Sequence, residues 1–166
     1  MKLLSSLALL AATTLVAHAD VNPADAFASI KKLQGDWRGP AMTKGMPPSH
    51  SVFRVTAAGS AVQETTWPGS KMEMISVYHM DKGNLLMTHY CALGNQPRMK
   101  LNAKKSTAQE LVFDFAGGTN LNPRRDKHMH SLTMKLSPQH LTMGGTSWTD
   151  GKEDANHCGV TLTRRN

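Results

Sequence analysis

The sequence predicts an all-β protein: an antiparallel up-and-down barrel of about eight to ten strands, preceded by one short helix. Three observations lead to this fold class. Short segments that alternate apolar and polar residues recur from residue 36 to the C-terminus. Turn-forming Gly, Pro, Asp and Asn residues separate most of these segments, and the spacing between them is even. About ten such strands can close on themselves and so remove exposed sheet edges.

The first nineteen residues predict a signal peptide. Lys2 supplies a positive charge, an apolar run follows from residue 3 to residue 16, and Ala17-His18-Ala19 fits the small-x-small cleavage pattern. The apolar run is shorter than the roughly 20 residues that a membrane-spanning helix needs. We therefore expect removal of residues 1–19, export to a periplasmic or secreted location, and one domain formed by residues 20–166.

The elements follow in order along the mature chain. A helix is predicted over residues 24–33, because Phe27, Ile30 and Leu33 recur every three residues and Gly35 follows as a stop. Three longer connections, at residues 42–49, 104–109 and 117–127, are expected mainly at the open end of the barrel. The predicted strands are 36–39, 50–56, 60–67, 72–80, 84–92, 98–103, 110–115, 128–136, 140–148 and 157–164.

Net charge places limits on the partners. The chain carries a formal charge of +7, but its basic residues are scattered in pairs at predicted strand ends and turns. No basic helix and no aromatic pair of the RNA-binding type accompanies them. This pattern predicts a solvated surface and no nucleic-acid partner, and it leaves open contact with an anionic ligand or a membrane surface.

The order of motifs resembles that of the calycin superfamily, which includes lipocalins, fatty-acid-binding proteins and nitrobindin-like barrels. The residues that carry the resemblance are Gly35 and Trp37 in a G-x-W motif after the short helix, and Arg164 in the last strand. The resemblance implies structural roles for these three, with the tryptophan packed across the barrel bottom against the arginine. Further lipocalin motifs are absent, and the chain resembles small exported lipocalin-like barrels of uncharacterised function. The resemblance therefore implies a fold and not an activity.

The most informative segment runs from residue 78 to residue 99 and reads as two strands joined by a turn at residues 81–84. Alternation places His89 and Cys91 on one face of the second strand with Leu85 and Met87, and Tyr90 on the other. An apolar face is the interior of a barrel. His89 and Cys91 are therefore either packed core residues or the wall of a binding site.

The same alternation sorts three more histidines. His128 and His130 share a face with Leu132, Met134 and Leu136, and His79 shares a face with Ile75 and Val77. We predict a small apolar or amphipathic ligand in the interior, oriented by a few polar groups. The predicted ligand-binding residues are His79, His89, Tyr90, Arg98, His128 and His130.

Each of these interpretations has an alternative. Arg98 is predicted to hold a carboxylate at the rim, but residues 94–98 also suit a simple tight hairpin. The second candidate function is binding of haem or a transition metal, with His89, Cys91, His128 and His130 as ligands. The eleven methionines suit an adaptable core, although thioethers also bind monovalent copper. The third candidate is a structural envelope barrel without a ligand.

Catalytic motifs are lacking, which favours a binding protein over an enzyme. The sequence holds no G-x-S-x-G and no H-E-x-x-H, and Glu64, Glu73 and Asp114 show no sign of facing each other. The two cysteines of an exported chain suggest a disulfide. However, the fifth and tenth strands of a closed barrel lie across from each other, which disfavours a bond between Cys91 and Cys158. The sequence leaves that pairing open.

Overall fold

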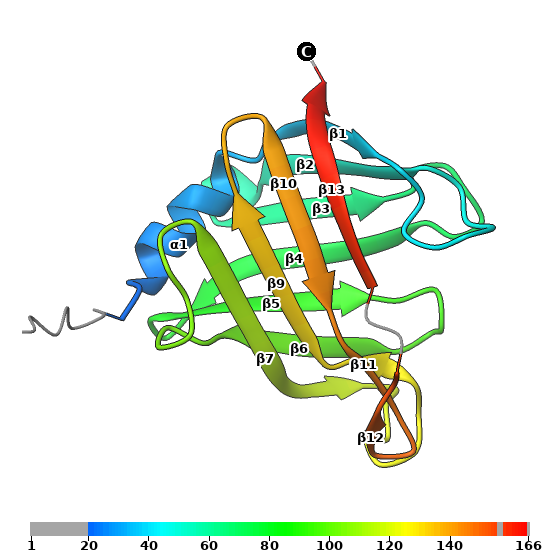
Figure 1. Cartoon of the computed structure of the whole chain (residues 1–166). Coiled ribbons are helices and arrows are strands. Elements are labelled where there is room, and N and C mark those ends of the chain that lie inside the picture. The colour runs from blue at the N-terminus through cyan, green and yellow to red at the C-terminus, as the bar shows by residue number, and fades with distance from the viewer. Residues whose placement is uncertain (1–19, 156–157, 166) are drawn as a thin grey trace, which may run out of the picture.

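The predicted fold class is confirmed by the computed structural model, which describes residues 20–155 and 158–165 (Figure 1). The predicted signal peptide, residues 1–19, and His157 lie outside the described residues. Ten strands form a closed antiparallel barrel in the order β1-β13-β10-β9-β7-β6-β5-β4-β3-β2. The elements are α1 (Pro23–Lys31), β1 (Gly35–Gly39), β2 (Ser49–Thr56), η1 (Ala57–Gly59), β3 (Ala61–Thr66), β4 (Met74–Asp81), β5 (Asn84–Tyr90), β6 (Gln96–Leu101), β7 (Glu110–Thr119), β8 (His128–Met129), β9 (Ser131–Leu136), β10 (His140–Gly145), β11 (Ser147–Thr149), β12 (Lys152–Glu153) and β13 (Cys158–Arg165).

Helix α1 lies across one end of the barrel, at the left in Figure 1. Asn22 caps it by accepting a hydrogen bond at 2.8 Å from the backbone N–H of Ala24, and Pro23 occupies the first turn. Phe27 and Ile30 are buried in the core below the helix. No helix in the described ranges is long and apolar enough to cross a membrane.

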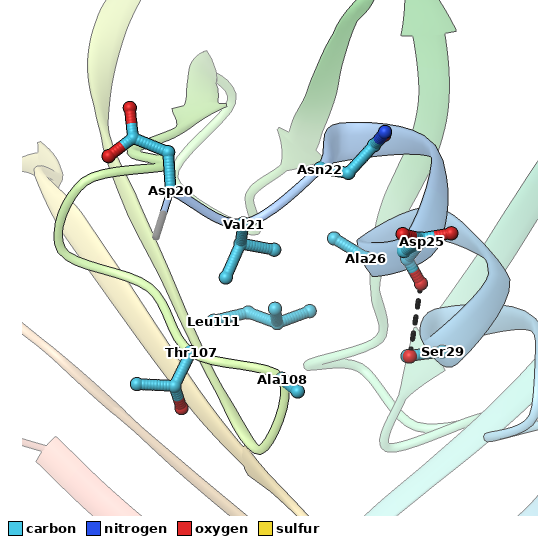
Figure 2. Close-up of a pocket in the computed structure, with 9 residues that line it drawn as sticks. All are labelled: Asp20, Val21, Asn22, Asp25, Ala26, Ser29, Thr107, Ala108 and Leu111. Atoms are coloured by element: carbon cyan, nitrogen blue, oxygen red, sulfur yellow. Dashed lines mark hydrogen bonds between the residues drawn. The ribbon is translucent and has the colours of Figure 1, made fainter. Parts of the chain in front are cut away.

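A pocket of about 290 Å³ lies at the helix end of the barrel, between the start of α1 and the loop that joins β6 to β7 (Figure 2). None of the ligand-binding residues predicted from the sequence lines it. The lining residues are Asp20, Val21, Asn22, Asp25, Ala26, Ser29, Thr107, Ala108 and Leu111.

Trp37 and Arg164 close the helix end of the barrel. The Trp37 side chain is fully buried, and its indole N–H donates to the carbonyl oxygen of Leu33 at 2.7 Å. The Arg164 guanidinium lies 4.3 Å from the Trp37 ring and donates to the carbonyl oxygens of Lys32 and Gln34, each at 2.7 Å. A β-carbon at Gly35, whose φ is +134°, would lie 3.1 Å from this guanidinium. The arrangement is the one that the resemblance implied, and it is consistent with a lipocalin-like barrel.

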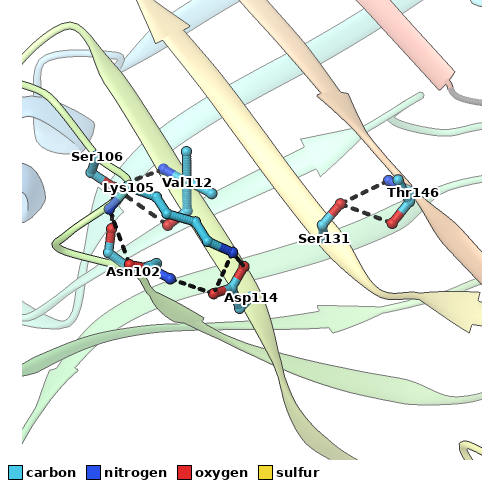
Figure 3. Close-up of polar contacts among 7 residues, drawn as sticks. All are labelled: Asn102, Lys105, Ser106, Val112, Asp114, Ser131 and Thr146. Atoms are coloured by element: carbon cyan, nitrogen blue, oxygen red, sulfur yellow. Dashed lines mark hydrogen bonds and ion pairs between the residues drawn. The ribbon is translucent and has the colours of Figure 1, made fainter.

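Two predicted strands are broken at the opposite end of the barrel. The predicted strand 128–136 divides into β8 and β9, and the predicted strand 140–148 divides into β10 and β11. At the break, Thr146 accepts backbone hydrogen bonds from both His130 and Ser131, and the hydroxyls of Thr146 and Ser131 lie 2.9 Å apart (Figure 3). A β-carbon on Gly145 would collide with the carbonyl oxygen of Ser131, so glycine permits this close approach. Beyond the break, β8, β11 and β12 form a separate three-stranded sheet.

Burial of the inward side chains differs between the two ends. In the half nearest α1 most of them are fully buried, whereas Val55, Met80 and Leu136 are half-buried. The fully buried residues are Tyr78, Leu85, Met87, Met99, Leu111, Phe113, Met134 and Leu141. At the other end, which we call the open end, inward residues such as Thr66, Met74, Cys91 and Met143 are only half-buried. These four residues are therefore partly accessible to solvent. Of the three long connections, those before β2 and β8 lie at this end, and that before β7 lies at the helix end.

Candidate functional site

Strand β5 carries His89 into the barrel interior, on the face that alternation predicts. The buried residues of this strand are Leu85, Met87 and His89, with exposed fractions of 0%, 0% and 5%. Cys91, the next residue on that face, is half-buried and has a free thiol. Tyr90 lies on the outer surface and is 50% exposed, so it does not line the interior.

The face of strand β4 that lies inside the barrel is the opposite of the predicted one. Its buried residues are Ser76 and Tyr78, whereas His79 is half-buried on the outer face. Both faces of β4 contain apolar residues, so alternation alone does not choose between them. The choice follows from hydrogen bonding: Tyr78 donates to Glu64, and Ser76 pairs with His89, so each buried polar group has a partner.

Glu64 is a buried carboxyl inside the barrel that was not among the predicted site residues. It is 2% exposed and accepts hydrogen bonds from Ser51 Oγ at 2.9 Å and from the Tyr78 hydroxyl at 3.0 Å. Burial raises the pKa of Glu64, although these donors act to lower it. Within the described ranges no Lys, Arg or His forms an ion pair with it. Its position between Val62 and Thr66 on one strand face was the available sequence clue.

The buried polar groups form a continuous row across neighbouring strands. Glu64 on β3 is paired with Ser76 on β4, which is paired in turn with His89 on β5. Ser51 and Tyr78 complete this interior polar row through their bonds to Glu64. The row lies between the filled half of the barrel and the open end.

His89 is held in the row as a neutral imidazole. Its Nδ1 lies 3.0 Å from Ser76 Oγ. Burial lowers the pKa of His89 to about 4, so the ring carries no charge at neutral pH. In the described part of the chain, no hydrogen bond involves its Nε2. This nitrogen is therefore available to a ligand.

His128 and His130 form a second cluster near the break between β8 and β9. His128 is 1% exposed and its Nδ1 lies 2.8 Å from the carbonyl oxygen of Asp126. A carbonyl only accepts, so Nδ1 carries the hydrogen, and in neutral His128 Nε2 accepts from His130 Nδ1 at 3.1 Å. The His130 ring is stacked between Trp148, at 3.8 Å between centroids, and Phe115, at 4.8 Å. Burial and the neighbouring His128 both lower the pKa of His130.

The residues around Arg98, predicted to form a ligand-binding rim, instead form hydrogen bonds with neighbouring loops. Arg98 is exposed on the outer face of β6, so it does not hold a head group in the interior. Asn95 donates to the carbonyl oxygen of Lys127 at 2.8 Å, and Gln96 accepts from Thr119 at 2.8 Å. The turn therefore fastens neighbouring loops to the barrel, as the hairpin alternative expected.

The predicted metal ligands do not form a group of the common type. His128 and His130 lie together, but across residues 20–155 and 158–165 no three His, Cys, Asp or Glu side chains are placed to hold a metal ion. Comparison with known proteins found no matching family model and no matching curated protein.

Proposed function

We propose that the protein is an exported carrier that binds a small, mostly apolar molecule inside the barrel, through the open end. The observation that carries this proposal is Glu64, a buried carboxyl without a cationic partner in the described residues, inside an interior otherwise rich in Leu, Met and Phe. Burying an ionisable group costs free energy that a purely structural core avoids. Such groups concentrate at functional sites. A calycin-type relationship, implied by Gly35, Trp37 and Arg164, agrees with this role.

The polarity of the row indicates the head group of the ligand. Glu64 offers acceptor oxygens, and His89 offers one neutral ring nitrogen without a partner. A ligand carboxylate would meet the Glu64 carboxyl without a nearby cation, because Arg98 lies on the outer face. We therefore propose a head group that donates hydrogen bonds, an alcohol or an amine. Its apolar part would contact Met74, Phe115 and Met143, which face the same end.

Calorimetric titration of the apo protein with a straight-chain alcohol, amine and carboxylate of equal length tests the proposal. We expect the alcohol and the amine to bind and the carboxylate to bind at least about tenfold more weakly, since one unfavourable buried contact costs more than about 1.4 kcal/mol. Glu64→Gln should weaken amine binding and reduce the penalty on the carboxylate.

Glu110→Gln is the matched control, because Glu110 lies on the outer face of β7 beside Lys135 and should leave all three affinities unchanged. The head-group assignment is wrong if the carboxylate binds as tightly as the amine. The carrier proposal itself is contradicted if none of the three binds and native mass spectrometry of the protein as isolated shows no bound small molecule.

A further inference from the structure

Two sulfur atoms face each other on the interior wall at the open end. Cys91 follows β5 and Met74 begins β4, and the pairing of Ile75 with Tyr90 next to them places the two residues opposite each other. The Cys91 thiol lies 4.0 Å from the Met74 thioether sulfur. Both residues are half-buried, so part of their surface is accessible to solvent.

An unpartnered nitrogen lies on the same wall. His89 precedes Cys91 by two residues, so both side chains project from one face of the chain about 7 Å apart at the backbone. Ser76 holds Nδ1 of the ring at 3.0 Å and leaves Nε2 without a hydrogen bond in the described part of the chain. The three side chains thus come from the ends of two hydrogen-bonded strands, which fix their positions.

We propose that Cys91, Met74 and His89 form a binding site for monovalent copper. Thiolate and thioether sulfur are soft ligands that select this ion, and a neutral imidazole is a common third ligand. Two sulfur atoms bound about 2.3 Å from one metal ion at a trigonal angle are roughly 4 Å apart, the separation found here before any movement. On binding, the Cys91 thiol releases its proton to solvent, and no electron is transferred.

The ligand set disfavours harder ions. The nearest interior carboxyl, Glu64, already accepts from Ser51 and Tyr78. Zinc sites require additional His, Cys or acidic ligands, and no such group of three is present across the described ranges. The site therefore differs from the four-residue metal set that the sequence suggested, because methionine replaces the pair His128 and His130. This inference rests on a different observation from the carrier proposal, the facing sulfur atoms of Cys91 and Met74, although the two proposals share His89 and Met74.

Anaerobic titration of the full mature chain with monovalent copper, against a chromophoric chelator of that ion, tests the site. We expect one equivalent to bind, and X-ray absorption to report two sulfur ligands and one nitrogen ligand. Cys91→Ser, Met74→Leu and His89→Gln should each weaken binding about tenfold or more, as loss of one of three ligands predicts. Each variant's fold is checked by circular dichroism.

Met74→Leu is the decisive variant, because leucine matches methionine in volume and the position is half-buried, so the barrel should fold. Met72→Leu is its matched control: Met72 is 46% exposed, and its replacement should not change copper affinity. Unchanged affinity in Met74→Leu, equal loss in Met72→Leu, or binding that needs Cys158 in place of Cys91 would overturn the proposal. Because no organic ligand is used, failure here leaves the carrier proposal standing.

Discussion

Replacing Arg164 by methionine should destabilise the protein by about 2–4 kcal/mol, although the residue lies in the last strand and is not fully buried. The guanidinium makes four contacts at once. It donates to the carbonyl oxygens of Lys32 and Gln34 at 2.7 Å and of Pro138 at 3.2 Å, and it covers the ring of Trp37. The first two carbonyls follow the end of α1, where a positive charge also interacts favourably with the helix dipole.

The expected magnitude is a sum of these contacts. Each of the three hydrogen bonds contributes about 1 kcal/mol net, because water partly replaces the lost donor. The cation–π contact with Trp37 adds about 0.5–1 kcal/mol. Methionine keeps an unbranched apolar stem in place of the arginine stem, so the loss reports mainly the contacts of the guanidinium.

Urea-induced unfolding, followed by tryptophan fluorescence and far-ultraviolet circular dichroism, measures this loss. Arg165→Met is the control, since Arg165 is exposed on the outer face of the same strand and should change stability by less than about 0.5 kcal/mol. Arg164→Lys should lose most of the same free energy, because a single ammonium cannot reproduce the fork between Lys32 and Gln34. A fully stable Arg164→Met, or complete rescue by lysine, would refute the reasoning.

Three further predictions concern the interior and the break in the barrel. Because the pKa of Glu64 is raised in the folded state, native protein retains a proton that the unfolded chain releases. Urea unfolding at a series of pH values should therefore show the free energy of unfolding falling as pH rises above 4.5, the ordinary pKa of a glutamate. The fall should reach up to about 1.4 kcal/mol per pH unit until the folded-state pKa of Glu64 is passed. Glu64→Gln should lack this component, and identical pH profiles of the variant and the parent would contradict the prediction. Gly145→Ala should lower the unfolding free energy by about 1–3 kcal/mol, because the added β-carbon collides with the carbonyl oxygen of Ser131. Gly159→Ala is the control, since a β-carbon there has its nearest atom at 3.6 Å and should not lower stability. Equal melting temperatures of the two variants would disprove the close approach. Trp37→Phe removes one buried N–H donor and should cost about 1–2 kcal/mol in the same urea assay, and a stability equal to that of the parent would show that the bond contributes nothing.

The strand positions and the closed barrel could be predicted from the sequence because turn residues separate the strands and alternation marks their faces. Alternation predicted the correct face at β5, because His89 shares a face with Leu85 and Met87, which must point into the barrel. It failed at β4, because both faces are apolar and the partners of Ser76 and Tyr78 are distant in sequence. The interior position of Glu64 depends on those same partners.

The break near His130 was unpredictable for a different reason. Residues 128–136 alternate without interruption, so local pattern indicates one strand. The break arises from a residue on the neighbouring strand, since Thr146 binds two successive backbone N–H groups and Gly145 permits the contact. As a result His130 stacks on Trp148, and the pair His128 and His130 stays apart from the interior polar row.

The pairing of β1 with β13 has a consequence for the order of folding. Trp37 is paired with Arg164, and the hydrogen bond from Arg164 to Gln34 joins residues 130 positions apart. Contacts this distant form slowly, because a long loop must close before they stabilise anything. Until β13 arrives, β1 and β10 have unpaired edges that can pair with strands of other molecules. The pairing of β13 with β1 and β10 is therefore expected to form last. A chain in which β13 has not yet paired would aggregate through these two strand edges.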